Sequence, residues 1–135
     1  MLSASFRPEA DLVALRTLLR HRAQLIAHRA PHVLHLHKAL VQMHIQLAQA
    51  LSDVTGDTGQ RILRAIVAGE RDPHTLAALR NSRCKKAVDD IARALTGTWR
   101  EEQLFVLKPA LALFDVYTTQ ISECDAQIEH AFSAI

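Results

Sequence analysis

The stretch LVALRTLLRHRAQLIAHRAPHVLHLHKALVQMHIQLAQA, residues 12–50, decides the fold, because its apolar residues recur at alternating spacings of three and four. Twelve positions fit this register, and ten of them are apolar. Such a repeat is typical of a helix face that packs against another long helix in a coiled coil. The twelve positions are Leu12, Leu15, Leu19, Arg22, Ile26, Arg29, Val33, Leu36, Leu40, Met43, Leu47 and Ala50.

Two arginines and a proline interrupt this face. Arg22 and Arg29 occupy register positions, where their aliphatic stems can pack while the guanidinium groups reach solvent. Pro31 lacks a backbone donor and clashes with the preceding turn, so a kink or break is expected near it. We predict a long basic helix over residues 9–51, preceded by an irregular lead over residues 1–8.

A second long helix is predicted over residues 99–133. Thr98 and Glu101 have the spacing of a capping box, in which both side chains bond backbone N–H groups at the helix start. Pro109 is expected to kink this helix. Seven of nine positions in its own register are apolar; they run Leu104, Leu107, Leu111, Phe114, Thr118, Ile121, Asp125, Ile128 and Phe132.

Turn signals divide the intervening residues 52–98 into three short helices. The first, over about residues 58–68, ends at Gly69, which suits a left-handed C-cap. The pair Asp72-Pro73 is an N-cap followed by a first-turn proline, and it opens a second helix to about residue 80.

The third short helix is expected over about residues 84–95. The sequence therefore predicts an all-α fold, in which two long helices form an antiparallel coiled-coil-like pair with a tip of three short helices.

The composition agrees with a small helical protein. Of the 135 residues, 21 are Ala and 19 are Leu, which favour helices, whereas aromatic residues make up 4%. The longest charge-free run, residues 39–52, is too short to span a bilayer, and no signal peptide is evident. Cys84 and Cys124 stand alone, which suits a reducing compartment. We expect a cytoplasmic protein with no membrane partner.

Positive charge is concentrated in the first third of the chain. The net charge is +2, but residues 1–49 carry +4 and residues 50–135 carry −2. The guanidinium group is a preferred partner of phosphate, so this region holds a candidate nucleic-acid contact. A solvated helix face is the alternative, since no aromatic residue interleaves for base stacking. The candidate cations are Arg16, Arg20, Arg22 and Arg29.

Two segments of the middle region are further candidates. Residues 54–59, VTGDTG, have the look of a helix-hairpin-helix loop, in which N–H groups at a helix N-terminus meet a phosphate, although a plain interhelical turn has the same composition. Residues 83–86, RCKK, form a basic patch. Lys85 and Lys86 could touch a backbone phosphate, or they could simply be a charged helix start.

No catalytic constellation is found in the sequence. His28, His32 and His35 share one helix face, a spacing that could place two imidazoles on a zinc ion. No acid or Cys lies between Asp11 and Asp53 to complete such a site, so solvated or partner-facing histidines are the alternative. We predict no catalytic residue, metal ligand or cofactor in this chain.

Several segments carry a family resemblance. The most specific are AGERDP, residues 68–73, and LTGTWR, residues 95–100. Weaker matches are SFRP at residues 5–8, LR through HRA at residues 15–23, VTG through Gly59, and LK through AL at residues 107–113. From about residue 3 to residue 130, the chain resembles the middle region of DEDD-type insertion-sequence transposases, the family guided by a bridge RNA.

The resemblance implies a non-catalytic role. Family members have a ribonuclease-H-like domain, whose acidic residues bind a divalent metal such as magnesium, and a second domain with a catalytic serine. This chain matches the coiled-coil assembly segment between them, and Ser3 and Ser5 precede that segment. We therefore expect a truncated transposase, inactive alone in DNA transposition, with DNA and guide RNA as implied partners and a homodimer through the long helices. The alternative is a stand-alone helical module for nucleic-acid binding or dimerisation.

Overall fold

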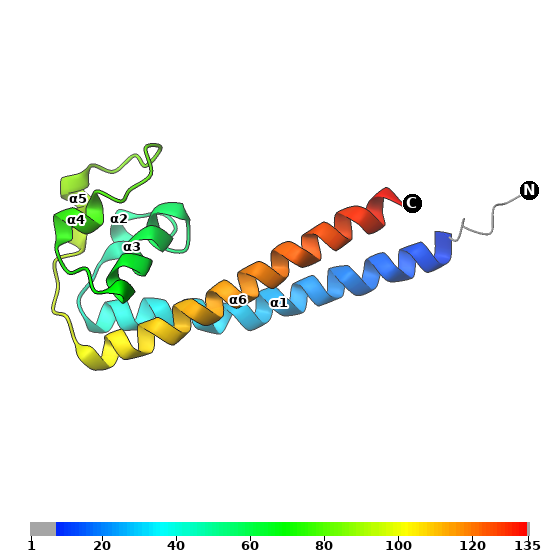
Figure 1. Ribbon diagram of the computed structural model, residues 1–135, viewed down its shortest axis with the longest axis horizontal. Coiled ribbons are helices and arrows are strands. Elements are labelled where there is room, and N and C mark those ends of the chain that lie inside the picture. The colour runs from blue at the N-terminus through cyan, green and yellow to red at the C-terminus, as the bar shows by residue number, and fades with distance from the viewer. Residues whose placement is uncertain (1–7, 135) are drawn as a thin grey trace, which may run out of the picture. The chain divides into compact units, whose positions relative to one another are not determined.

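The computed structural model describes residues 8–134, and every regular element within them is an α-helix (Figure 1). Two long helices, α1 (Pro8–Gln42) and α6 (Glu101–Ser133), come first and last along the chain, with four short helices between them. The all-α prediction is confirmed for these residues, while the predicted lead lies outside them except for Pro8. The short helices are α2 (Leu47–Ala50), α3 (Asp57–Ala68), α4 (Pro73–Ala77) and α5 (Val88–Ala94).

The described chain divides into two compact units, and each long helix contributes to both. Unit 1 comprises residues 8–31 and 113–134, and unit 2 comprises residues 32–112. Neither proline breaks its helix, because α1 continues through Pro31 and α6 continues through Pro109, while the kinks expected at both residues stay predictions. A proline removes one backbone hydrogen bond, and a long helix retains the others.

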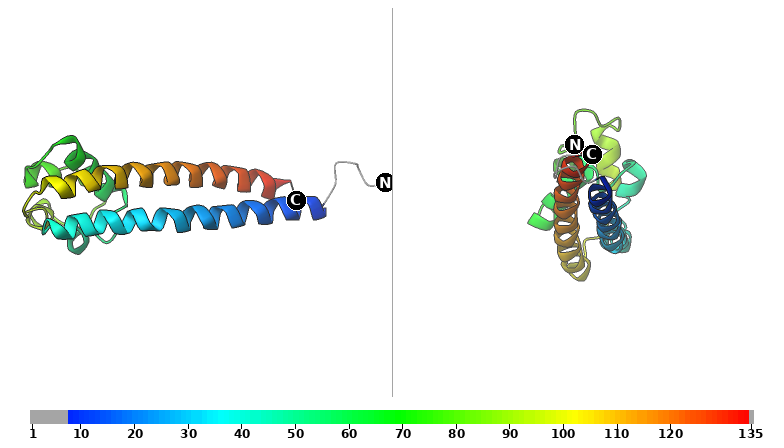
Figure 2. Two further views of the ribbon diagram at one scale, coloured as in Figure 1. Left: turned by 90° about the horizontal axis from the view of Figure 1, so that it is seen from below. Right: turned by 90° about the vertical axis from the view of Figure 1, so that its right-hand side faces the viewer.

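In unit 1 the two long helices lie side by side and run in opposite directions (Figures 1 and 2). Arg22 on α1 meets Asp125 on α6, whereas Arg29, farther along α1, meets Thr118. The residue number on α6 falls as the number on α1 rises, which defines an antiparallel pair. The pairing of two long helices is therefore confirmed.

The seam of unit 1 is offset from the predicted register. Leu25, and not Ile26, is the buried residue on this part of α1. Leu12, Leu19 and Ile26 keep 41%, 48% and 37% of their surface exposed. The predicted register alternates steps of three and four, and the observed one takes the two steps in the opposite order. A shift of one residue turns the side chain by about 100° around the helix.

The same offset occurs near the end of α6. Cys124 is buried where the register places Asp125, and Phe132 is 68% exposed although the register assigns it to the apolar seam. Ile121 fits both registers and is buried as predicted. The two registers share every second position, so the apolar pattern of a single helix does not distinguish them.

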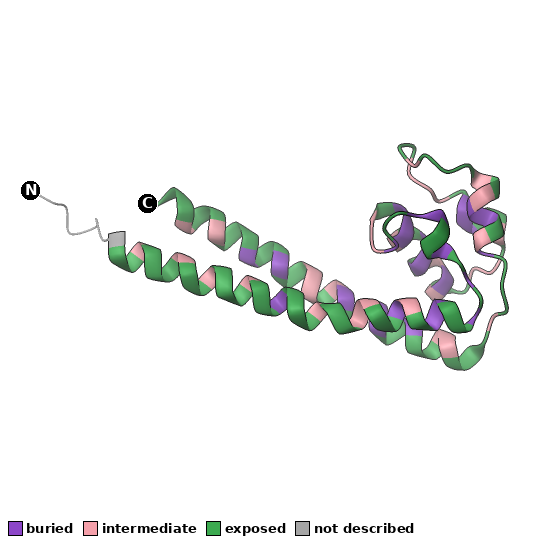
Figure 3. Cartoon of the chain, turned by 180° about the vertical axis from the view of Figure 1, so that it is seen from behind, coloured by how far each residue is buried: buried purple, intermediate pink, exposed green. Residues whose placement is uncertain are grey.

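Unit 2 contains the most deeply buried part of the protein, as Figure 3 shows. All ten of the largest fully buried side chains lie in this unit. Each of the six helices supplies at least one of them, and two more lie just after the ends of α1 and α5. These side chains are Leu36, Met43, Leu47, Ile62, Leu63, Ile66, Leu76, Ile91, Leu95 and Leu107.

The first long helix ends earlier than predicted. α1 stops at Gln42 and not near residue 51, because His44 adopts a left-handed conformation with φ of 58°. Gly97 packs against this turn, and a Cβ atom there would lie 2.4 Å from the Met43 carbonyl oxygen. The apolar spacing continues into α2, which is why periodicity alone carries the predicted helix too far.

Two predicted helix boundaries are confirmed. Gly69 caps α3 with φ of 115°, in the left-handed region that favours glycine. Asp72 caps α4, accepting hydrogen bonds from the Thr75 N–H at 2.9 Å and the Thr75 hydroxyl at 2.7 Å. These two bonds from Thr75 lower the pKa of the Asp72 carboxyl. α4 itself ends at Ala77, short of the predicted residue 80.

The predicted capping box is wrong, because α6 begins later than the box requires. α6 begins at Glu101, so this residue is the first helical position and not the third. The Arg100 carbonyl accepts the N–H groups of Gln103 and Leu104, which makes Arg100 the residue at the helix start. Glu101 and Glu102 still place negative charge in the first turn, where the helix dipole favours it.

α6 is long and apolar enough to cross a membrane, judged by length and composition only. In unit 1, Ile121 and Cys124 on this helix form a buried cluster with Leu25 of α1. The predicted absence of a membrane partner stays a prediction.

Candidate nucleic-acid interface

The loop before α3 is held by its own side chains. The Asp53 Oδ1 atom accepts hydrogen bonds from the Thr55 N–H at 3.0 Å and the Thr55 hydroxyl at 2.8 Å. Gly59 lies directly under this loop, and a Cβ atom there would lie 1.8 Å from the Val54 carbonyl oxygen. Only glycine permits this approach, so the VTGDTG segment forms a tight, defined junction with the start of α3.

Asn81 fastens a second loop to the same helix end. Its Nδ2 atom donates to Asp57 Oδ2 at 2.6 Å, and its backbone N–H donates to the buried Thr58 hydroxyl at 2.9 Å. The Asn81 Oδ1 atom accepts the Arg83 N–H at 2.9 Å. These bonds hold Asn81 at the start of α3, and they thereby fix the point from which the following segment extends.

The loop that follows carries three cations. Arg83, Lys85 and Lys86 are exposed, and no carboxylate within residues 8–134 forms an ion pair with them. The prediction of a helix from residue 84 is wrong, because Ala87 caps α5 and the helix begins at Val88. The basic patch is therefore a loop and not a charged helix start.

A pocket joins the two loops. Its volume is about 590 Å³, and its lining comes from residues 50–58 and residues 81–86. Ala50 and Leu51 supply buried apolar surface, while the three cations and Asp53 supply charge. The structure thus brings together VTGDTG and RCKK, two candidate segments that lie more than 20 residues apart in the sequence.

A smaller pocket of about 300 Å³ adjoins the first through Ala50 and Lys86, which line both. Gln46 and Gln49 contribute exposed amide groups to it, and Arg93 is paired there with Asp90. Lys86 is therefore positioned between an apolar pocket and a polar one.

The four arginines of α1 divide into two pairs with different roles. Arg16 and Arg20 are exposed. Arg22 donates from Nε to Asp125 Oδ1 at 2.5 Å, and this bond raises the pKa of the Arg22 guanidinium. Arg29 donates to the Thr118 hydroxyl at 3.2 Å.

The guanidinium of Arg29 also lies 5.2 Å from the centre of the Phe114 ring. Arg22 and Arg29 therefore serve contacts within unit 1, whereas Arg16 and Arg20 form no side-chain hydrogen bond or ion pair with another residue of 8–134.

The histidines do not converge on a metal site. Among residues 8–134, no three His, Cys, Asp or Glu side chains come together to hold an ion. His28 instead lies edge to face with Tyr117, at 6.2 Å between ring centres. His32 and His35 make a similar contact with each other at 6.0 Å.

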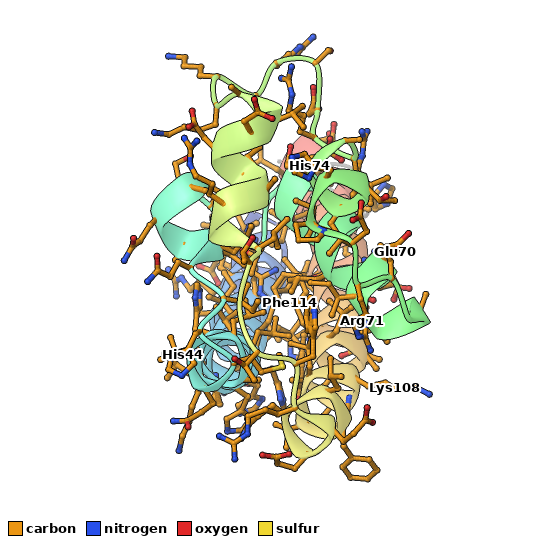
Figure 4. All side chains as sticks on the ribbon, turned by 90° about the vertical axis from the view of Figure 1, so that its left-hand side faces the viewer. His44, Glu70, Arg71, His74, Lys108 and Phe114 are labelled. Carbon is orange, nitrogen blue, oxygen red and sulfur yellow. The ribbon has the colours of Figure 1, made fainter. Side chains whose placement is uncertain are left out.

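The two stretches that carry the most specific sequence resemblance, AGERDP and LTGTWR, meet in unit 2. Arg71 of AGERDP places its guanidinium 5.0 Å from the centre of the Trp99 ring of LTGTWR. The same Arg71 side chain donates to the carbonyl oxygens of Ile66 at 2.7 Å and Glu70 at 2.8 Å, and Figure 4 shows it beside Glu70. Both stretches therefore contribute packing at the end of α3, away from the residues that line the pocket.

Sequence reasoning missed the role of Asn81. The sequence indicates only a turn at this residue, because its partners, Asp57 and Thr58, are more than 20 residues distant. No short-range pattern reports such a contact.

No protein-family model, curated protein or solved structure matches the chain.

Proposed function

We propose that this chain is a non-catalytic assembly segment of a DEDD-type insertion-sequence transposase, and that unit 2 binds the phosphates of a nucleic acid. The family assignment is supported by the sequence resemblance, and in this proposal the short helices form the tip of the paired long helices. The binding role is supported by one observation above all: Arg83, Lys85 and Lys86 lie on a loop that Asn81 holds against α3, and they form no ion pair with a carboxylate of residues 8–134. Unpaired cations on a fixed loop suit contact with a polyanion.

The binding role is tested by charge reversal at two places. The double variant Lys85→Glu/Lys86→Glu should lose at least about tenfold in affinity for a duplex DNA and a stem–loop RNA, because two phosphate contacts become repulsive. The matched control is Arg16→Glu/Arg20→Glu, which makes the same change on α1. Fluorescence anisotropy at low salt measures both. An equal loss in the two variants, or none in the first, contradicts the proposed loop contact.

The family assignment has a separate test. The genomic DNA on both sides of the coding segment can be read in all frames. We expect it to encode parts of a ribonuclease-H-like domain or a serine-containing domain. If neither is encoded there, the transposase assignment fails, and the alternative of a stand-alone nucleic-acid-binding module takes its place.

The homodimer is proposed on a second observation in unit 1. Leu12, Leu19 and Ile26 recur every seven residues on α1 and form an apolar stripe that the α6 seam leaves exposed. A stripe with this spacing suits a further helix, which a second copy of α1 would supply.

Light scattering tests the dimer directly. The wild-type chain should have a concentration-dependent mass that approaches twice the monomer mass. Leu19→Ser/Ile26→Ser should shift the protein toward monomer, because the stripe loses its apolar surface. Leu34→Ser, which alters an exposed leucine in unit 2, is the control and should not change the mass. A wild-type mass that stays monomeric at every concentration refutes the dimer.

A further inference from the structure

The larger pocket of unit 2 has a composition that phosphate contact alone does not require. Its surface is mainly apolar, with Ala50 and Leu51 among the buried residues, and its volume is about 590 Å³. Pockets of roughly 300–1,000 Å³ are typical of sites that enclose a small organic group. A loop that touched only a backbone phosphate would need the cations and no such cavity.

We propose that this pocket binds one unpaired nucleotide of a single-stranded nucleic acid. The base lies against the apolar surface, and the phosphates on either side of it meet Lys85 and Lys86 at the rim. The inference rests on the proposed nucleic-acid role and adds the class of nucleic acid to it. A base in a duplex is stacked and paired, so it must leave the stack before it can enter a pocket.

Asp53 gives the pocket a preference among bases. Its Oδ1 atom is occupied by Thr55, while its Oδ2 atom has no donor among the described residues. The other carboxylate of the lining, Asp57, is already bonded to Asn81 and paired with Arg61. A carboxylate accepts a hydrogen bond from the amino group of a base such as cytosine. The pocket should therefore favour bases that carry an amino group over thymine or uracil.

The smaller pocket indicates where the next nucleotide lies. Lys86 lines both pockets, so a phosphate on Lys86 connects a base in the first pocket to a base in the second. Gln46 and Gln49 of the second pocket offer amide groups, which both donate to and accept from base edges. The two pockets thus form a short track of about two nucleotides.

Cys84 provides a direct probe of occupancy. It lines the larger pocket and is a half-buried free thiol, whereas Cys124, the other cysteine, is buried in unit 1 and serves as the internal control. The rate of maleimide alkylation of the full chain is measured by mass spectrometry with no oligonucleotide, with a cytosine-rich single strand, and with the same strand in a duplex. A matched RNA strand distinguishes the two sources of nucleotide.

The single strand at saturation should slow Cys84 alkylation by at least about tenfold, since thiol reactivity depends on access. The duplex should slow it much less, and Cys124 should be unaffected throughout. If the single strand binds but Cys84 reacts at its original rate, or if the duplex protects equally well, the pocket inference is overturned and the phosphate-binding proposal stands. If neither nucleic acid binds, both are overturned.

A filled pocket gives a second test. Cys84→Phe should reduce affinity for the single strand about tenfold and leave duplex affinity unchanged, because the phenyl group occupies the space of the base. Cys84→Ser is the matched small-residue control and should bind the single strand more tightly than Cys84→Phe. Circular dichroism confirms that both variants fold. Equal single-strand affinity for Cys84→Phe and Cys84→Ser contradicts the inference.

Discussion

The two helices of unit 1 pack along a narrow seam, whereas the helices of unit 2 pack around a buried hydrophobic core. In unit 1 the cluster of Leu25, Ile121 and Cys124 is buried, and polar contacts such as Arg22 with Asp125 lie along the same interface. In unit 2, ten large apolar side chains are fully buried and draw on six helices. The two units therefore obtain their stability in different ways.

The difference shows what each unit can offer to a partner. Unit 1 keeps an apolar stripe at Leu12, Leu19 and Ile26, which its own seam leaves exposed. Unit 2 has the larger buried core, although Leu34 and Phe105 are exposed, and it presents Lys85 and Lys86 beside a pocket, where they form no ion pair with a carboxylate of residues 8–134. We therefore propose helix association for unit 1 and nucleic-acid contact for unit 2.

The largest expected effect comes from truncating the core of unit 2. Leu63→Ala should lower the free energy of unfolding by about 2–5 kcal/mol, because a fully buried leucine leaves a cavity. Leu25→Ala in unit 1 should cost less, since its surroundings are partly open to solvent. Urea denaturation measures both variants. A greater loss for Leu25→Ala would contradict the ranking of the two units.

The next effect is a steric one inside unit 2. Gly59→Ala should destabilise the chain by about 1–3 kcal/mol, because the new methyl group overlaps the Val54 carbonyl and the loop must move. It should also weaken nucleic-acid binding, since that loop lines the pocket. Gly56→Ala is the control: its Cβ atom would lie 3.2 Å from the Asp53 carbonyl oxygen, so a small shift relieves it. Equal melting temperatures for the two variants would contradict the tight junction.

A smaller effect is expected from the seam of unit 1. Arg29→Leu should raise the melting temperature by a few degrees, because an apolar side chain suits a helix–helix seam better than a guanidinium that must be desolvated. Arg20→Leu, which changes an exposed arginine on the same helix, is the control and should have little effect. A marked fall in the melting temperature of Arg29→Leu would mean that its contacts with Phe114 and Thr118 stabilise the pair on balance.

The smallest effect is a pH dependence at the start of α4. The pKa of Asp72 is lowered in the fold by its bonds with Thr75, so the cap stabilises the protein above the ordinary aspartate pKa. This contribution is lost as the pH falls through the lowered pKa. Asp72→Asn keeps a capping group that does not titrate. The stability difference between wild type and Asp72→Asn should therefore shrink or reverse below about pH 4.

That prediction is checked by thermal melting of both proteins between neutral pH and strongly acidic pH. A difference in melting temperature that stays constant over the whole range would show that the Asp72 cap does not contribute through its charge.

Local signals predict the helices well and their partners poorly. Gly69 and Asp72 are predicted correctly because caps depend on a few neighbouring residues. The predicted seam is one residue out at Ile26 because the correct face depends on α6, nearly 100 residues away. His44 ends α1 early through a left-handed conformation that a histidine seldom adopts and the sequence does not announce.

The candidate site shows the same division. Local composition identifies Lys85, Lys86 and the VTGDTG loop as possible phosphate contacts. Their meeting at one pocket depends on Asn81 and its long-range bonds to α3, which no spacing in the sequence reports. The roles of Arg22 and Arg29 likewise differ from those of Arg16 and Arg20 only because α6 lies beside them.

The salt dependence of nucleic-acid binding tests the central claim most directly. Affinity for a duplex DNA is measured by anisotropy over a series of salt concentrations for the wild type and for Lys85→Ala/Lys86→Ala. If both lysines bind phosphates, the slope of log affinity against log salt should become shallower by about 1.8 in the variant, because each neutralised phosphate contributes about 0.9 to the slope. An unchanged slope, with or without a change in affinity, would contradict phosphate binding by this loop.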